Sequence, residues 1–353
     1  MKRSVGCIDG AGRGVCVEQD RPALRLGQVG VTVQASLISP GTELGGIPAL
    51  RQQPDPGRSP RPFGYANAGV VSEVGEGVTR LRPGDRVACM GAGYALHSDW
   101  AAVPENLCVP VPDSVSIEEA TFAHLAATAL HAVRRAEPVF GENAMVMGLG
   151  LVGQLTAQLA GLCGCHVLGV DRLALRLATA RQTGIEEVVD AGAEDPVAAA
   201  ARFSRGYGMD FGVIAFGGDA SAAFEQLYQS LKLTPDTHRM GRIVVVGGAR
   251  IDHGWAAALG NVDVRSAART GPGYHDEAYE HGADYPAVFV EWTTRRNLEE
   301  CLRAVAVGRL RVRPLISHEL PLTEIGRAVD LLVDQPGTAL GVVLRPQRGG
   351  SSR

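Results

Sequence analysis

Residues 144–153 read AMVMGLGLVG, an apolar run that leads into three glycines spaced as G-x-G-x-x-G. The pattern predicts a buried strand, a tight turn and a helix that opens at the last residues of the motif. Gly148 permits the sharp turn, Gly150 lets the backbone approach a pyrophosphate, and Gly153 allows the helix to pack close to the strand. The free N–H groups at the helix start favour an anion. The stretch predicts a dinucleotide site formed by Gly148, Gly150, Leu151, Val152 and Gly153.

The next strand-like run, residues 166–171, ends in Asp171, eighteen residues after Gly153. A carboxylate at this position can accept hydrogen bonds from ribose hydroxyls and repels a 2′-phosphate, so it favours NAD over NADP. The neighbouring Arg172 weakens that preference and keeps NADP as an alternative cofactor. A glycine turn in an α/β protein that binds no cofactor is the other interpretation of the motif.

Strand-like and helix-like runs alternate through the middle third of the chain. The further strands are expected at 188–190, 211–216, 242–246 and 262–267, and the further helices at 117–135, 173–183 and 220–231. Parallel strands need a crossover connection, which is usually helical. We therefore expect an α/β fold with a Rossmann-type, doubly wound parallel sheet here. Two later helices are expected at 298–307 and 322–332.

The first hundred residues have a different texture, with short apolar runs interrupted by glycine and proline. This pattern is typical of an irregular β-rich domain. The chain has 353 residues, and single cores rarely grow beyond roughly 250–300 residues. We therefore expect two domains, and a tail at 347–353 that frays.

Charge and composition restrict the partners. The net charge is −4 and the pI is about 6.2, which supplies no positive field for nucleic acid, so a small-molecule substrate is expected. No apolar run approaches the roughly 20 residues that span a bilayer, and no signal-peptide core follows the N-terminus. We expect no membrane association and a cytoplasmic location. Seven cysteines without a disulfide or metal-finger rhythm predict reduced thiols.

Two further segments carry a family resemblance. Residues 62–75 read PFGYANAGVVSEVG and residues 82–87 read RPGDRV. Together with the glycine motif they resemble the signature G-H-E-x-x-G-x-V-x-x-x-G … G-D-R-V of the medium-chain dehydrogenases/reductases, over nearly the whole chain. The resemblance implies a GroES-like β-barrel catalytic domain built from residues 1–117 and 272–353. A Rossmann nicotinamide-dinucleotide domain, residues 118–271, is then inserted between its two parts.

The departures from the family pattern concern zinc. Where zinc-dependent members carry a ligand cysteine in a C-G-T-D-like motif, this sequence has Pro40, and where they carry the ligand histidine it has Tyr65. The third ligand position falls on Ala123, although His124 is adjacent. A zinc site needs about three protein ligands and an open position, and the four-cysteine lobe of the structural zinc is also missing. We therefore expect no metal at either site.

A narrower resemblance lies in four short segments. They are SLISPGTE at 36–43, GPGY at 271–274, DYP at 284–286 and WTTRRN at 292–297, and Tyr279 belongs to the same resemblance. These segments are similar to the zinc-free branch that includes bacteriochlorophyllide dehydrogenase, the dehydrogenase half of bidomain sugar oxidoreductases, and cyclitol oxidoreductases. The branch implies a polyhydroxylated or otherwise bulky alcohol as substrate.

Without zinc, a protein group must stabilise the negative charge that develops on the substrate oxygen. Tyr65 stands at a former ligand position and can donate a hydrogen bond or a proton; a barrel tyrosine that caps the cleft is the alternative. Thr42 matches the hydroxyl that relays protons in zinc-dependent relatives. His124 is either part of the relay or an ordinary core histidine. Glu43 matches a carboxylate behind the ligands and is assigned to the substrate site, with an anchor for an arginine as the alternative.

The resemblance also implies contacts to the nicotinamide and to the substrate. Thr128 matches a small polar residue beside the nicotinamide ring, and the backbone after the strand at 242–246 borders that ring. The residues assigned to this backbone are Gly247, Gly248 and Ala249. Tyr274 and Tyr279 are assigned to the substrate pocket with their neighbours His275 and His281, although a loop of this composition is also normal solvated surface.

The leading hypothesis is hydride transfer between NAD(H) and a secondary alcohol or ketone on a sugar, cyclitol or similar ring. One alternative is reduction of an activated C=C bond, as in zinc-free quinone and enone reductases. The other is a non-catalytic regulatory protein that binds NAD. By analogy with the family we also expect a homodimer through the cofactor domain, with the edge strand near 262–267 at the interface.

Overall fold

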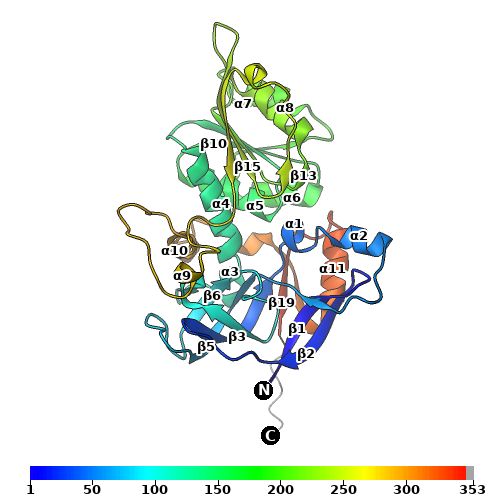
Figure 1. The fold of residues 1–353 in the computed structure, drawn as a ribbon. Helices are drawn as coiled ribbons and strands as arrows, with labels where there is room; N and C mark the ends of the chain where they lie inside the picture. Colours follow the sequence, from blue (N-terminus) through cyan, green and yellow to red (C-terminus); the bar gives the residue numbers. More distant parts are fainter. Residues whose placement is uncertain (347–353) are drawn as a thin grey trace. The chain divides into compact units, whose positions relative to one another are not determined.

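The computed structural model describes residues 1–346 and contains two compact units. Unit 1 comprises Met1–His124, Gly271–Gly308 and the chain from Ile316 onwards, and unit 2 comprises Leu125–Thr270 and Arg309–Leu315. Blue segments from the start of the chain and red segments from its end build unit 1 in Figure 1. The domain boundaries inferred from the sequence stay a prediction. The fraying expected at 347–353 lies outside the described residues.

Unit 2 is organised around a parallel sheet whose strand order is β11-β10-β9-β12-β15, with β17 beside β15. The strands are β9 (Asn143–Met147), β10 (His166–Asp171), β11 (Glu187–Asp190), β12 (Phe211–Ile214), β15 (Arg239–Val246) and β17 (Asn261–Ala267). A short strand, β14 (Lys232–Leu233), pairs antiparallel with β15. The strand order reverses between β9 and β12, and ligands of doubly wound sheets bind at such a reversal. The predicted parallel sheet is confirmed.

The crossover connections between the parallel strands of unit 2 contain the helices α5 (Leu151–Leu162), α6 (Ala174–Thr183), α7 (Pro196–Phe203) and α8 (Ser221–Ser230). Helix α4 (Ala123–Ala136) precedes β9, and the remaining short elements are β13 (Gly218–Asp219), β16 (Ala249–Arg250), η2 (Ala256–Leu259) and η3 (Arg313–Leu315). The helix expected over 117–135 is broken into α3 (Ile117–Ala120) and α4. Helix α7 was not predicted, although Asp195 caps it through the N–H groups of Val197 and Ala198 and proline occupies its first position.

The core of unit 2 follows from strand alternation. Met145 and Met147 of β9 share one apolar cluster with Leu168 of β10 and with α7 and α8 residues such as Phe224. The intervening residues of β9 point to the other face of the sheet. On the α5 side, a Cβ at Gly153 would lie 1.8 Å from the carbonyl oxygen of Gly148. Only glycine therefore allows α5 to approach the turn after β9 this closely.

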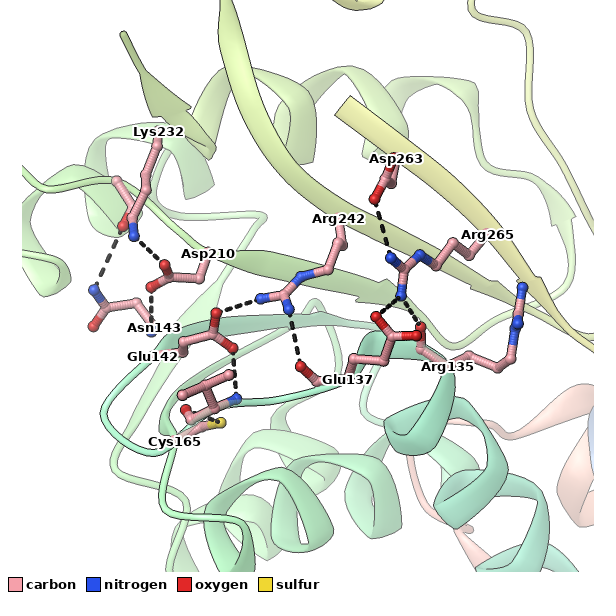
Figure 2. A network of polar contacts seen from close by, with 12 residues as sticks. Arg135, Glu137, Glu142, Asn143, Cys165, Asp210, Lys232, Arg242, Asp263 and Arg265 are labelled. Carbon is pink, nitrogen blue, oxygen red and sulfur yellow. Dashed lines mark hydrogen bonds and ion pairs between the residues drawn. The ribbon is translucent and has the colours of Figure 1, made fainter. Parts of the chain in front are cut away.

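Polar contacts tie the amino ends of the parallel strands together (Figure 2). Arg242 donates to the carboxylate of Glu142, which precedes β9, at 2.5 Å. Asp210, which precedes β12, accepts from the backbone N–H of Asn143 at 2.8 Å and also binds Lys232. Both carboxylates are thus used in joining neighbouring strands. This leaves the carboxyl ends of the same strands, where the glycine motif lies, for a ligand.

Unit 1 is β-rich and joins both ends of the chain. Its larger sheet has the order β18-β19-β3-β5-β6-β8, with β7 beside β3. The strands are β3 (Gln28–Leu37), β5 (Ala66–Val74), β6 (Arg86–Met90), β7 (Trp100–Pro104), β8 (Cys108–Pro110), β18 (Ile316–Pro321) and β19 (Gly341–Arg345). A second sheet contains β1 (Lys2–Ile8), β2 (Gly14–Asp20) and β4 (Arg61–Pro62). Because β19 pairs antiparallel with β3, the end of the chain completes a sheet begun near its start.

Most helices in the described part of unit 1 are short, and only α10 (Thr294–Ala306) and α11 (Ile325–Asp334) of these are longer than two turns. The short ones are α1 (Pro40–Glu43), α2 (Ile47–Gln52), α3, η1 (Glu105–Leu107), α9 (Glu277–Glu280) and η4 (Leu322–Glu324). The helices expected at 298–307 and 322–332 correspond to α10 and α11, and both begin or end a few residues from the predicted bounds. All seven cysteines are free thiols, as expected.

Two predictions concern surfaces of the molecule. Strand β17 pairs with β15 along one side and has no strand on its other side among residues 1–346. The homodimer expected through this edge concerns a second chain and stays a prediction. In the described part of the chain, every helix is too short or too polar to traverse a bilayer.

Candidate active site

The glycine motif forms an open cradle at the carboxyl end of β9. Gly148 has φ +88°, in the left-handed region that favours glycine, and a Cβ there would also approach the side chain of Phe216. A Cβ at Gly150 would meet no described atom within 4 Å. Helix α5 begins at Leu151 with no side-chain cap from the described residues, so its first N–H groups can bind an anion. These residues fit the pyrophosphate of a dinucleotide.

Asp171 joins the glycine turn to the turn after β10. The residue is 9% exposed, and its carboxylate accepts hydrogen bonds from the backbone N–H groups of Leu149 at 2.7 Å, Arg172 at 2.7 Å and Leu173 at 2.9 Å. Asp171 is thus the last residue of β10, where the sequence predicted an acidic residue. Its carboxylate holds two turns of the backbone together, in addition to any hydrogen bond that it makes with a ribose. The side chain of Arg172 is exposed to solvent.

Arg176 was not singled out from the sequence. Its Nη1 lies 3.4 Å from the Asp171 carboxylate, and its Nε is buried without a hydrogen bond to the described residues. A basic residue in the first turn of α6, five positions after Asp171, is the signal that could have found it. Its unused N–H can serve a hydroxyl or phosphate oxygen of a dinucleotide.

The residues assigned to the nicotinamide lie in the same unit. Thr128 is half-buried on α4. Gly247 follows β15 with φ +69°, and a Cβ at Gly247 or Gly248 would meet nothing described within 4 Å. Ala249 begins β16, which pairs with β13. The glycine motif, Asp171 and Gly247 thus follow the carboxyl ends of parallel strands in one sheet, where such ligands bind.

In unit 1, the hydroxyl of Tyr65 lies in a cluster of polar side chains. Tyr65 is 8% exposed, and its hydroxyl makes hydrogen bonds with the side chains of Ser39 and Thr42. Burial, and after it the negative charge of Glu43, raises the pKa of Tyr65 well above its ordinary value. The phenol therefore stays protonated at neutral pH and is available as a hydrogen-bond donor.

The segment that carries Ser39 and Thr42 is held by apolar anchors on both sides. Ile38, Leu44 and Ile47 are buried in a cluster with residues of β18, α11 and β19. Proline at the first position of α1 suits the helical φ and has no N–H to leave unsatisfied. Thr42 itself is exposed, so its hydroxyl connects the buried Tyr65 hydroxyl to solvent.

His124 contacts the backbone of Tyr65. Its Nδ1 lies 2.9 Å from the carbonyl oxygen of Tyr65, and because a carbonyl only accepts, Nδ1 carries the hydrogen. The two rings lie 4.2 Å apart between centroids. Burial lowers the pKa of His124 to about 4, so the imidazole is neutral at pH 7. The structure thus brings together Tyr65, Thr42 and His124, the three residues predicted to be catalytic.

Glu43 lies behind Tyr65 with its side chain 3% exposed. One carboxylate oxygen accepts from the backbone N–H of Ser39 at 2.6 Å. The other lies 3.3 Å from Nε2 of His97. The sequence suggested an arginine as the partner if Glu43 is an anchor, and the structure instead pairs it with this histidine. Neither Ser39 nor His97 was predicted as a site residue, and His97 is too distant in sequence for any spacing to indicate it.

The tyrosines predicted to bind substrate differ in their surroundings. The hydroxyl of Tyr274 accepts from the backbone N–H of Ala92 at 2.8 Å, and its ring lies 6.3 Å from that of His124. Tyr279 is 1% exposed and stacks on Tyr285. Its hydroxyl accepts from the backbone N–H of Arg295 at 3.2 Å, which joins α9 to α10. Tyr274 therefore borders the cluster, whereas the burial of Tyr279 does not favour the substrate contact assigned to it.

The residues at the former ligand positions do not fit a zinc ion. Pro40, Tyr65 and Ala123 supply no thiolate, imidazole or carboxylate, which are the usual zinc ligands. Across residues 1–346, the structure contains no group of three or more His, Cys, Asp and Glu side chains arranged to hold a metal. These residues therefore supply no zinc-dependent step, and independence from zinc stays a prediction.

Two families match the two units. Residues 26–113 match the alcohol dehydrogenase GroES-like domain, and residues 152–272 match the zinc-binding dehydrogenase family. The expected combination of a GroES-like domain and a Rossmann-type domain is confirmed. The chain belongs to the medium-chain alcohol dehydrogenase superfamily and is an NAD(P)-dependent oxidoreductase that acts on CH–OH groups. The non-catalytic alternative is set aside.

Individual relatives are distant. Mouse sorbitol dehydrogenase is 26% identical over 317 residues, which cover 82% of this chain and 80% of that protein. The D-xylulose reductase of Saccharomyces cerevisiae is 32% identical over 162 residues, only 38% of this chain and 46% of that enzyme. An Escherichia coli oxidoreductase/dehydrogenase of unknown specificity superimposes with a TM-score of 0.80 at 19% identity, covering 99% and 100% of the two chains. At this identity the superposition shows the shared fold.

The burial of His124 predicts a dependence of stability on pH. Folding lowers the pKa of His124 from 6.5 to about 4, so the unfolded chain binds this proton first as the pH falls. The stabilising contribution is present above pH 6.5 and is lost between pH 6.5 and 4. At about 1.4 kcal/mol per pKa unit it amounts to roughly 3 kcal/mol.

Urea unfolding of the wild type and His124→Gln at several pH values measures this contribution. The stability advantage of the wild type over the variant should shrink as the pH falls from 7 to 4.5. A difference that does not change with pH would show that His124 is not buried in its neutral form.

Proposed function

We propose that the protein transfers a hydride between NAD and a secondary alcohol or ketone on a polyhydroxylated ring, such as a sugar or cyclitol, without zinc. The observation that carries the proposal is the buried Tyr65 hydroxyl, bonded to Ser39 and Thr42 at a position where zinc-dependent members carry a ligand. The named relatives, a sorbitol dehydrogenase and a D-xylulose reductase, support a polyol or its ketone as substrate.

Tyr65 is the proposed proton donor in the direction of reduction. When bound, the nicotinamide supplies the hydride to the carbonyl carbon. Tyr65 donates its hydroxyl proton to the carbonyl oxygen as negative charge develops there, so that a C–H and an O–H bond form and the C=O π bond is lost. A proton from solvent then returns to the phenolate through the hydroxyl of Thr42, which is exposed. Alcohol oxidation follows the same steps in reverse.

His124 has a different task in this proposal from the proton relay considered for it. A neutral imidazole with a pKa of about 4 donates no proton from a charged form at pH 7. Its Nδ1–H holds the backbone of Tyr65, and its ring packs against the tyrosine ring. We therefore assign His124 to orienting Tyr65, and Tyr274, which borders the cluster, to contact with the substrate.

The choice of NAD over NADP rests on Asp171. Replacing it with serine removes the charge that repels a 2′-phosphate, so Asp171→Ser should narrow the preference for NAD by about tenfold or more. Fluorescence titration with both cofactors measures the two affinities. Asp190→Ser is the matched control, because Asp190 ends the adjacent strand β11 and binds its own turn through the N–H of Gly192.

The control should leave the cofactor preference unchanged. Tighter binding of NADP than of NAD by the wild type would contradict the proposal and assign the 2′ position to a cation such as Arg172 or Arg176.

The role of Tyr65 predicts a large loss of turnover in Tyr65→Phe. The variant keeps the ring and loses only the donor, so kcat should fall by on the order of 10²- to 10⁴-fold while NAD affinity stays nearly unchanged. Nicotinamide absorbance with a panel of cyclitols, sugar ketones, enones and quinones measures turnover. Wild-type turnover in the variant, with hydride transfer shown to limit the rate, would remove Tyr65 as the donor. Activity on enones or quinones alone would favour C=C reduction instead.

A further inference from the structure

We propose that Glu43 and His97 form a buried pair that positions Tyr65 and adjusts its readiness to release a proton, with His97 acting through Glu43. The inference rests on the proposed role of Tyr65 and deepens it. His97 acts on Tyr65 through Glu43, which its Nε2 approaches to 3.3 Å, so it is a positioning residue.

The contacts run from β3 to the Tyr65 hydroxyl. The hydroxyl of Ser36 lies 2.8 Å from Nδ1 of His97, and Nε2 of the same ring lies 3.3 Å from Glu43. The second oxygen of Glu43 accepts from the N–H of Ser39 at 2.6 Å. The side chain of Ser39 is in turn bonded to the hydroxyl of Tyr65. Each member of the pair is therefore connected to Tyr65 without an intervening gap.

Burial makes the pairing of Glu43 and His97 necessary. His97 is 0% exposed and the carboxylate side chain of Glu43 is 3% exposed. An isolated charge in such a place is costly unless an opposite charge or a donor faces it. The contact at 3.3 Å lies within ion-pair distance, but within the described chain Oε1 and Nε2 make no hydrogen bond of good geometry. The interaction is therefore electrostatic and can be altered without breaking an ideal hydrogen bond.

The backbone also links His97 to Tyr65. The N–H of His97 donates to the carbonyl of Phe63 at 3.2 Å, two residues before Tyr65. Between them, Gly64 has φ +127°, and a Cβ there would lie 2.3 Å from the backbone nitrogen of His97. The glycine lets the two segments touch, so the position of His97 and the position of Tyr65 are determined together.

The charges around the Tyr65 hydroxyl determine how Glu43 and His97 change its acidity. The titratable groups that face the Tyr65 hydroxyl are Glu43 and Tyr274, with His124 against the ring and His97 behind Glu43. Burial keeps His124 neutral at pH 7, and the negative charge of Glu43 is the neighbouring charge that raises the pKa of Tyr65. This negative charge opposes formation of the phenolate, and the N–H of His97 offsets part of that charge. Removal of Glu43 and removal of His97 should therefore change the acidity of Tyr65 in opposite directions.

Direct titration of Tyr65 tests this without relying on turnover. The ultraviolet absorbance of phenolate is followed against pH for each protein and for the same protein with Tyr65→Phe, and the difference isolates Tyr65. Wild-type Tyr65 should stay protonated where exposed tyrosines ionise, near pH 10, whereas in Glu43→Gln it should ionise at least about one pH unit lower than in the wild type. In His97→Asn the ionisation should not move to lower pH. An unchanged titration in Glu43→Gln would overturn the proposal.

Kinetics test whether His97 acts through Tyr65. His97→Asn should lower kcat for ketone reduction by about tenfold with little change in KM, and His97→Gln, whose amide restores an N–H toward Glu43, should recover most of the loss. In the Tyr65→Phe background, His97→Asn should have little further effect. An equal loss in both backgrounds would show a merely structural role and overturn the proposal.

Controls keep these outcomes apart. His166→Asn is the matched control, because His166 forms an exposed pair with Glu186 at 3.2 Å in unit 2, and it should change neither readout. If His97→Asn does not fold, Ser36→Ala removes only the Nδ1 partner and should shift kcat in the same direction. If Tyr65→Phe alone retains full turnover, the proposed function fails, and the phenolate titration still decides whether the pair controls Tyr65.

Discussion

The carbonyl oxygen of Tyr65 accepts two hydrogen bonds, from the backbone N–H of Gly91 at 3.0 Å and from Nδ1 of His124 at 2.9 Å. These bonds join the loop after β6 and the start of α4 to the residue that precedes β5. The hydroxyl at the other end of the same residue binds Ser39 and Thr42. Tyr65 is thus held at both ends, and a donor that is fixed before substrate arrives loses little freedom on reaction.

A comparable arrangement organises the cofactor site. Asp171 binds the backbone N–H groups of both the glycine turn and the turn that starts α6. Because the carboxylate connects two neighbouring turns, the cradle at Gly150 has its shape before a dinucleotide binds. In both units, one side chain or carbonyl joins separate segments of the chain. The polar contacts at the amino ends of the strands are structural and leave the opposite ends free (Figure 2).

Local patterns predicted the cofactor unit closely. The alternation of apolar runs located β10 and placed α6 and α8 within a residue of their observed bounds, because strand and helix periods are properties of neighbouring residues. The turn at Gly148 and the acid at Asp171 follow from spacing in the same way. Tyr65 and Thr42 were identified by aligning the sequence with the family motif. This alignment matches positions in the chain and does not use contacts between residues.

The sequence did not predict contacts between distant parts of the chain. His97 lies more than fifty residues from Glu43, and only the close approach at Gly64 brings its ring behind the carboxylate. Arg176 is a candidate cofactor residue because its Nε is buried without a hydrogen bond to the described residues, and no sequence pattern reveals that burial. The stacking of Tyr279 on Tyr285 and its bond from Arg295 were likewise not predictable from the sequence, and its assignment to the substrate pocket stays a prediction. A residue's environment depends on tertiary packing, which a single sequence does not specify.

In the proposed reaction, a protein hydroxyl and not a metal ion meets the charge on the substrate oxygen. Elemental analysis of the purified, active enzyme, combined with turnover after exhaustive chelation, tests it most directly. A hydroxyl in this role predicts far less than one zinc per chain and full retention of activity, since Pro40, Tyr65 and Ala123 offer no ligand set. About one zinc per chain, with activity lost on its removal and restored on its return, would show that a metal ion meets this charge instead.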